Sequence, residues 1–246
     1  MNSNMNERNY LTESIFLFKD KLFYEKNGIK EVKNYNWHHI LRDYGWEKLH
    51  KQWIKKLNKY LEKPINNSLY GCLDCGSGGD CLFHCISYVL NEMYDNNVYT
   101  ANDLRKDLSD SLKEERYNEL IEFYKIFKEV GDFDEDWDPN TMTIDSFKEL
   151  IIKGGDEYWG DFLIVNLIKE YLNINLIILN SNEITEEYYN YPLFYEYEEG
   201  LNTIILLYED GHHFKLVGHF QEGNMITLFN QQTIPTEILK MINYLR

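Results

Sequence analysis

The chain has 246 residues, of which 43% are hydrophobic and 15% aromatic, so it can bury a full core and is not a disordered protein. Its 41 acidic and 25 basic residues give a formal net charge of -16, which opposes nucleic acid or an anionic membrane surface as the main partner. The charge fits either a basic protein partner or a simple role in solubility.

The cysteines and the N-terminus bear on the cellular compartment. Four cysteines are too few for a disulfide scaffold in a chain of this length, and MNSNMNERNY lacks the layout of a secretion signal. The longest apolar runs fall far short of the roughly 20 residues that span a bilayer. We therefore expect no membrane association and a cytoplasmic protein. Abundant Asn, Ile, Lys and Tyr hint at an AT-rich genome, so the cytoplasm is a host's if the source is a virus or an intracellular microbe.

The first part of the chain is charged and aromatic. Apolar residues recur at near-helical spacing from Trp37 to Leu61, which predicts one or two amphipathic helices. Pro64, with Asn66 and Asn67, predicts a boundary. We expect an N-terminal helical region at residues 1–63 and a main domain at residues 64–246. The helical region either packs on the main domain or contacts a partner.

Helices are predicted in the middle of the chain. The apolar residues from Cys81 to Tyr94 fall on one helical face, and a glycine-rich turn precedes them, so Cys81 is expected at a helix N-terminus. Residues 101–129 predict further charged helix. Residues 131–140 (GDFDEDWDPN) predict an acidic loop, which is either solvated surface or a partner contact.

The last third alternates between helix and strand patterns. Asp161 is predicted to cap a helix over residues 162–172, and the apolar stretch 173–179 predicts a short buried strand. Three further strands at 203–208, 212–220 and 225–229, joined by short turns, predict a β-meander. Together these elements indicate an α+β fold with a small, mostly antiparallel central sheet flanked by helices.

The four cysteines lie close together along the chain, so a zinc site is one alternative. Cys72, Cys75, Cys81 and Cys85 follow the spacing CxxC, five residues, CxxxC. The five residues between Cys75 and Cys81 are too few for paired zinc knuckles. Cys81 and Cys85, both on the predicted helix, would also have to turn away from the core to bind a metal. We therefore predict no metal and favour a core position for Cys85.

Cys81 has the surroundings of a nucleophile. The N-terminus of a helix favours the thiolate, the form that attacks carbonyl carbon, so the pKa of this thiol is expected to fall. Gly78 and Gly79 permit a backbone in which N–H groups, with Asp80, face a reacting oxygen as an oxyanion hole requires. A cysteine nucleophile also needs a base, and His212 and His213 point to opposite faces of one predicted strand. Only one of the two can serve Cys81.

Three segments then resemble a known family in the right order. GDCLFHCIS looks like the motif Asp-Gly-x-Cys-Leu-Phe-Arg-x-Ile of the OTU (ovarian tumour) cysteine proteases. YWGDFLIVNLIKEYLNINLIIL is similar to the Trp-Gly segment that opens a helix and leads into a strand of that family, and HHFKLVG is similar to its closing histidine strand. The resemblance spans residues 72–220, and residues 1–63 and 95–155 show no such match.

The resemblance implies a papain-like OTU fold and a deubiquitinase, which hydrolyses isopeptide bonds at the C-terminus of ubiquitin or a ubiquitin-like modifier, polyubiquitin chains included. By position, Cys81 is the nucleophile and His213 the base, because Phe214 takes the aromatic place after it. Neither a cofactor nor a metal is implied, and a monomer is expected. An acidic surface suits ubiquitin, whose C-terminal tail carries arginines.

Two positions depart from the family pattern and leave the third catalytic residue open. Gly78 stands where the family has aspartate, and Lys215 stands where it often has Asp or Asn. If the hairpin turn centres between Glu222 and Gly223, His213 faces Gln232 directly and Asn230 diagonally on the same sheet face. We therefore predict Asn230 as the third catalytic residue, with Gln232 and Asp80 as substitutes.

Two other functions stay open at the level of the sequence. The missing aspartate and the nearby lysine also fit a ubiquitin-binding module with weak or no catalysis. A thiol protease that acts on another protein, such as a viral-type polyprotein, fits the same cysteine and histidine.

Overall fold

The computed structural model describes residues 8–64, 68–93, 98–133, 136–181 and 192–245. By its internal contacts the chain divides into two compact units, which do not coincide with the predicted boundary after residue 63. The first unit comprises Met1–Cys75 and Ile174–Arg246, and the second comprises Gly76–Asn173. Asn66, Asn67 and Tyr94 lie outside the described residues. In the part of the chain that is described, none of the helices is long and apolar enough to cross a bilayer.

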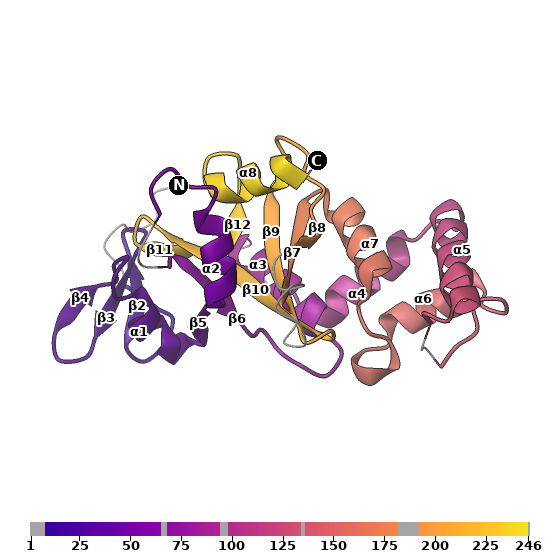
Figure 1. Ribbon diagram of the computed structural model, residues 1–246. Coiled ribbons are helices and arrows are strands. Elements are labelled where there is room, and N and C mark those ends of the chain that lie inside the picture. Colours follow the sequence, from indigo (N-terminus) through magenta and orange to yellow (C-terminus); the bar gives the residue numbers. More distant parts are fainter. Residues whose placement is uncertain (1–7, 65–67, 94–97, 134–135, 182–191, 246) are drawn as a thin grey trace. The chain divides into compact units, whose positions relative to one another are not determined.

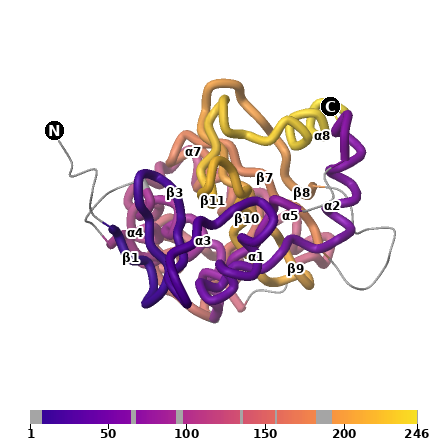
Figure 2. The backbone as a smooth tube through the Cα atoms, turned by 90° about the vertical axis from the view of Figure 1, so that its left-hand side faces the viewer, coloured from indigo at the N-terminus to yellow at the C-terminus, as the bar shows by residue number. Residues whose placement is uncertain are grey.

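The start of the first unit is a sheet, which corrects the predicted N-terminal helical region. Strands β1 (Asn9–Tyr10), β2 (Ile15–Phe18), β3 (Lys21–Glu25) and β4 (Ile29–Glu31) form a four-stranded sheet in that order; the same indigo strands are drawn as a tube in Figure 2. Lys19 and Asp20 both have positive φ, as a two-residue hairpin turn requires. Phe16 stacks on Phe23 across β2 and β3, and this aromatic pair between neighbouring strands stabilises the sheet.

The predicted helical stretch 37–61 is interrupted by a strand. It contains α1 (Trp37–Ile40), the 3-10 helix η1 (Leu41–Tyr44), β5 (Trp46–Lys48) and α2 (Lys51–Asn58). Gly45 ends η1 with a φ of 88°, and the chain then extends into β5. The helical prediction is therefore right for α1 and α2 and wrong between them.

The larger sheet carries the histidine segment. Its main path runs β5-β6-β10-β9-β7-β8, with β11 beside β10 and β12 beside β9. The strands beyond β5 are β6 (Tyr70–Leu73), β7 (Asn175–Ser181), β8 (Pro192–Phe194), β9 (Thr203–Glu209), β10 (His213–Gln221), β11 (Asn224–Ile226) and β12 (Leu228–Phe229). The pairs are antiparallel except for β7 with β9. The α+β class is confirmed, and the sheet is larger than predicted.

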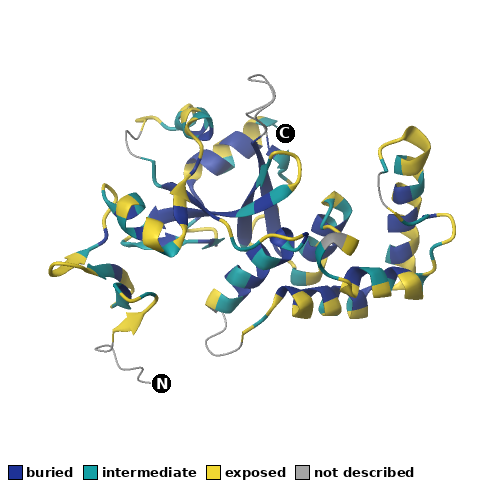
Figure 3. Cartoon of the chain, turned by 90° about the horizontal axis from the view of Figure 1, so that it is seen from below, coloured by how far each residue is buried: buried dark blue, intermediate teal, exposed yellow. Residues whose placement is uncertain are grey.

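One face of this sheet is covered by α2 and by α8 (Thr236–Leu245), which lie side by side in Figure 1. The core between these helices and the sheet includes Trp53, Val217 and Met241. The central strands of the larger sheet are buried and dark blue in Figure 3. The indole Nε1 of Trp53 donates a hydrogen bond of 2.7 Å to the carbonyl oxygen of Asn180. The segment before residue 63 thus contributes to the same core as the C-terminal strands.

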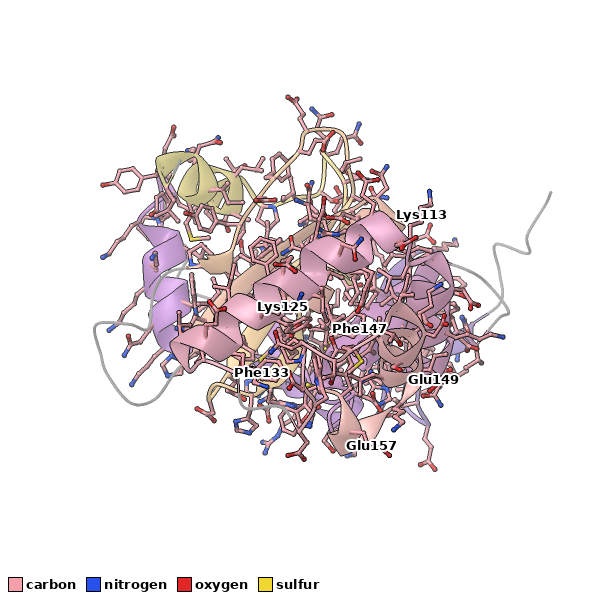
Figure 4. All side chains as sticks on the ribbon, turned by 90° about the vertical axis from the view of Figure 1, so that its right-hand side faces the viewer. Lys113, Lys125, Phe133, Phe147, Glu149 and Glu157 are labelled. Carbon is pink, nitrogen blue, oxygen red and sulfur yellow. The ribbon has the colours of Figure 1, made fainter. Side chains whose placement is uncertain are left out.

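The second unit is helical. It comprises α3 (Cys81–Met93), α4 (Ala101–Ser111), α5 (Glu114–Val130), α6 (Ile144–Ile152), the 3-10 helix η2 (Gly155–Glu157) and α7 (Phe162–Leu172). Asp161 caps α7 as predicted, with its Oδ1 accepting from the Ile164 N–H at 2.9 Å. Phe133 and Phe147 lie below α5 in Figure 4, in an aromatic cluster with Tyr124, Trp137 and Tyr158.

Candidate active site

Cys81 is the first residue of α3, as the sequence predicts. The carbonyl oxygen of Asp80 accepts the first helical hydrogen bond, from the His84 N–H at 2.8 Å. Leu82 lies against Gly160, and the ring of Phe83 lies against the guanidinium of Arg105, so the start of α3 is packed within its own unit. The thiol therefore lies in the first turn, where the N–H groups of a helix have no partner within it and where the backbone dipole favours an anion.

The loop before Cys81 has a backbone that requires glycine. Gly78 and Gly79 have φ values of +79° and +85°. A Cβ atom on Gly79 would lie 2.0 Å from the carbonyl oxygen of Gly155, so no side chain fits at this position. Loop residues 78–80 are thus held close to η2 of the same unit.

The carboxylate of Asp80 is engaged within the second unit. Its Oδ1 lies 2.6 Å from Nη2 of Arg105, and its Oδ2 accepts from the Gly155 N–H at 3.1 Å. Both oxygens therefore have partners other than a histidine. Asp80 thus stabilises the loop within its own unit.

The imidazole of His213 is paired in the first unit with a residue that the sequence analysis missed. Nε2 of His213 lies 3.3 Å from Oδ2 of Asp74, with the two side chains 19% and 54% exposed. Asp74 directly follows β6, His213 begins β10, and these strands are antiparallel neighbours with Leu73 opposite Leu216. Because side chains alternate along a strand, Asp74 and His213 share one sheet face.

A signal for Asp74 exists in the sequence. YGCL at residues 70–73 is a short apolar run, and a carboxylate follows it immediately. If this run is a strand antiparallel to the histidine strand, its C-terminal end, which Asp74 follows, lies beside the N-terminal end of that strand, where His213 is. An apolar run of four residues does not by itself distinguish a strand from a buried helical segment.

Asn230 does not face His213 across the hairpin. The predicted register is correct next to the turn, where Gln221 pairs with Asn224, but β11 pairs with β10 only back to His219. Further along, β10 is already paired on both edges, by β6 and by β9, so no edge is left for a third strand. The chain therefore moves to β9 at β12, and His213 lies opposite Glu209 instead of Gln232.

Residue Asn230 has a different role in the first unit. Its Oδ1 accepts hydrogen bonds from the backbone N–H groups of Gln232 and Thr233, at 2.8 and 3.0 Å. The side chain is exposed and fixes the turn that follows β12. The expectation that Asn230 is placed beside the imidazole is therefore wrong.

The two other unusual positions of the histidine strand also have structural partners. His212 is exposed in the turn before β10, with its Nδ1 2.9 Å from the carbonyl oxygen of Asp210. Nζ of Lys215 lies 2.5 Å from Oε2 of Glu209. Burial opposes the charge of Lys215, but the hydrogen bond and the charge of Glu209 outweigh it and raise the pKa of the lysine. The positive charge is thus balanced beside the histidine.

The structure groups no three His, Cys, Asp or Glu side chains as metal ligands among the residues it describes. Cys85 is fully buried in α3. Burial raises the pKa of Cys72, on β6, to about 12, which keeps that thiol protonated. Cys72 and Cys85 therefore have the surroundings of core residues, as predicted for Cys85.

No family model matches the chain, and no curated protein matches it. Solved structures do match. The chain is similar to OTU domains. An OTU domain in complex with ubiquitin is 17% identical, with 71% of this chain and 83% of that one covered and a TM-score of 0.42.

Two other OTU structures come from a virus and a bacterium. The viral OTU domain protease from Dera Ghazi Khan virus is 14% identical, with 62% and 82% covered and a TM-score of 0.41. An OTU deubiquitinase from Wolbachia pipientis wMel is 13% identical, with 72% and 98% covered and a TM-score of 0.37. These OTU structures belong to the family that the three sequence motifs resemble.

Proposed function

We propose that the chain is a cysteine protease of the OTU type that hydrolyses isopeptide bonds at the C-terminus of ubiquitin or a ubiquitin-like modifier. The observation that carries this proposal is the pair of His213 and Asp74, with 3.3 Å between Nε2 and Oδ2. A carboxylate at Nε2 favours the tautomer with its proton on that nitrogen. The Nδ1 lone pair is then the base.

In this proposal Cys81 is the nucleophile and Nδ1 of His213 takes its proton. The thiolate attacks the carbonyl carbon, the C–N bond breaks, and the imidazolium gives its proton to the departing lysine amine. Water, deprotonated by His213, then attacks the thioester carbon and breaks the C–S bond, which releases the carboxylate and restores the thiol. The N–H of Cys81 and one N–H from residues 78–80 stabilise the oxyanion in each step.

The substrate class follows from the motif resemblance and the charge of the chain. A net charge of -16 suits a modifier whose C-terminal tail carries arginines, and it opposes nucleic acid as a partner. The proposal includes polyubiquitin chains as substrates, a monomeric enzyme without cofactor, and action in the cytoplasm. With a viral or microbial source, that cytoplasm is the host's.

A ubiquitin probe with an electrophilic C-terminus tests the proposal. Wild-type protein should form a covalent adduct, and Cys81→Ala should form none. Cys75→Ala is the matched control, because Cys75 is a partly exposed cysteine just before the loop, and this variant should react like wild type. Adduct formation that survives in Cys81→Ala would overturn the assignment of the nucleophile.

The same probe separates the other functions. Tight binding of ubiquitin without covalent capture by the wild-type protein would indicate a binding module. Cleavage of unrelated peptides, combined with no reaction towards ubiquitin or its relatives, would indicate a thiol protease with another protein as substrate. Either result would replace the proposed function.

A further inference from the structure

Arg105, on α4, is a fully buried cation beside the nucleophile loop, with 0% of its side chain exposed. Its Nε and Nη2 lie 2.7 and 2.6 Å from Oδ1 of Asp80. Nη1 donates to the carbonyl oxygen of Ile151 at 3.0 Å, and Nη2 donates to that of Tyr158 at 2.8 Å. One guanidinium thus joins the residue before Cys81 to the end of α6 and to the segment after η2.

The other surfaces of this ion pair are also occupied. The guanidinium carbon lies 3.8 Å from the centre of the Phe83 ring, so the cation is stacked on α3 itself. The second oxygen of Asp80 accepts from the Gly155 N–H at 3.1 Å. Because hydrogen bonds engage its planar array of donors, the buried guanidinium is held in a single orientation. A lysine ammonium group cannot make the same set of bonds.

The cation and the thiol also interact through their charges. Burial lowers the pKa of Arg105, and the charges of Asp80 and Cys81 oppose that shift. Because this electrostatic coupling is mutual, the positive charge of Arg105 favours the thiolate of Cys81. Asp80 neutralises most of that charge and thereby limits the effect.

We infer that Arg105 and Asp80 form a positioning pair that holds residues 78–80 against Gly155 and sets the fraction of Cys81 present as thiolate. The part of this inference that concerns turnover rests on the proposed function. The part that concerns the thiol does not, because the reactivity of Cys81 is measured without ubiquitin.

Two conservative variants separate position from charge. Arg105→Lys keeps the charge but loses the fork, so the loop should shift while the thiolate fraction stays near wild type. Asp80→Asn leaves the cation unbalanced and cannot accept from both donors, so it should disturb the loop and increase the thiolate fraction. A residue with only a structural role would not make Cys81 more acidic when it is changed.

The experiment measures alkylation of Cys81 by iodoacetamide against pH, with peptide mass spectrometry as readout, and kcat and KM on a fluorogenic ubiquitin substrate. We expect the alkylation midpoint of Asp80→Asn to move to lower pH by about one unit. We expect kcat of both variants to fall about 10-fold or more with KM within about twofold, since small shifts of catalytic groups reduce turnover strongly.

Arg116→Lys is the matched control. Arg116 also pairs with two carboxylates, Glu119 and Glu170, each at 2.7 Å, but its side chain on α5 is 26% exposed, whereas that of Arg105 is fully buried. This variant should change neither the midpoint nor kcat. An Asp80→Asn midpoint that stays at the wild-type value or moves to higher pH, or wild-type kcat in folded Arg105→Lys, would overturn the inference.

Wild-type protein provides a measurement that does not depend on the variants being folded. The Arg105 Nε–H resonance in NMR spectra should be protected from solvent exchange and should shift when Cys81 is alkylated. The Nε–H resonance of Arg8, whose side chain is 41% exposed, should do neither. An Arg105 resonance that exchanges as fast as that of Arg8, or that does not shift on alkylation, would overturn the inference. If wild type proves unreactive towards ubiquitin, the proposed function fails, and the alkylation and NMR results still decide the inference.

Discussion

The imidazole of His213 meets the carboxylate of Asp74 where β10 begins and β6 ends, with 3.3 Å between Nε2 and Oδ2. The residues come from the two separate chain segments that make up the first unit. Antiparallel pairing of β6 with β10 brings them to the same end of the sheet. This pairing gives the histidine a carboxylate although neither usual family position supplies one.

Asp74→Ala should lower kcat on a fluorogenic ubiquitin substrate on the order of 100-fold, because the imidazole loses the group that fixes its tautomer. Ubiquitin binding should be unchanged. Asp138→Ala is the control, since Asp138 forms a surface ion pair with Lys128 and has no part in the proposed chemistry. Equal losses in the two variants would argue against an orienting role for Asp74.

Asn230→Ala should retain wild-type turnover and lower the free energy of unfolding by about 1 kcal/mol, which is the usual net contribution of a hydrogen bond to stability. The reason is that the Asn230 side chain accepts from two backbone N–H groups in a turn. Urea denaturation and steady-state kinetics measure both effects. A loss of turnover as large as in Asp74→Ala would restore Asn230 as the orienting residue.

Gly79→Ala should destabilise the protein by about 3 kcal/mol, because a positive φ and a contact with the Gly155 carbonyl both oppose a side chain. Gly131→Ala is the control: φ is +82° there too, but a Cβ would meet nothing within 4 Å. We expect about 1 kcal/mol for the control. Urea denaturation of both variants measures the part of the destabilisation that comes from the contact with the Gly155 carbonyl. Equal losses of unfolding free energy in the two variants would mean that the backbone shifts to relieve this contact at no cost.

His219 should make the protein less stable in acid. Burial lowers its pKa from 6.5 to about 4, and neither ring nitrogen has a hydrogen-bond partner. The unfolded chain therefore binds the proton first as the pH falls below 6.5. Stability from the neutral imidazole is full above pH 6.5 and falls by up to about 3 kcal/mol as the pH approaches 4.

Replacement of His219 isolates this contribution. His219→Leu should flatten the pH dependence of the unfolding free energy between pH 6.5 and 4, as measured by urea denaturation at several pH values. His39→Gln is the control, because His39 is exposed, and it should keep the wild-type slope. A wild-type slope in His219→Leu would assign the acid sensitivity to another group.

The parts of the structure that sequence patterns predicted are those with strong local signals. The helix from Cys81 follows from apolar periodicity after a glycine turn, and α7 follows from periodicity after a capping Asp161. Strand β9 has an unbroken β-branched and aliphatic run. In each case the residues that determine the element lie within it, so no knowledge of distant contacts was needed.

The parts that were missed depend on partners outside the missed element. Strands β1–β4 are short, and the pairing of Phe16 with Phe23 stabilises a sheet in a region that was expected to be helical because of the apolar spacing from Trp37 to Leu61. Asp74 becomes a neighbour of His213 only through the pairing of β6 with β10. The turn geometry gave the local register correctly, but it did not show that both edges of β10 were already taken.

The close approach of Gly79 to the Gly155 carbonyl has an evolutionary consequence. A methyl group at the first position is tolerated only if the backbone at the second retreats, and the second is itself bent at a φ of +68°. The two sites are therefore expected to mutate in concert, with both glycines retained or both replaced among descendants of a common ancestor. A lineage in which only one of the two glycines was replaced would have needed a different backbone conformation in the loop before Cys81.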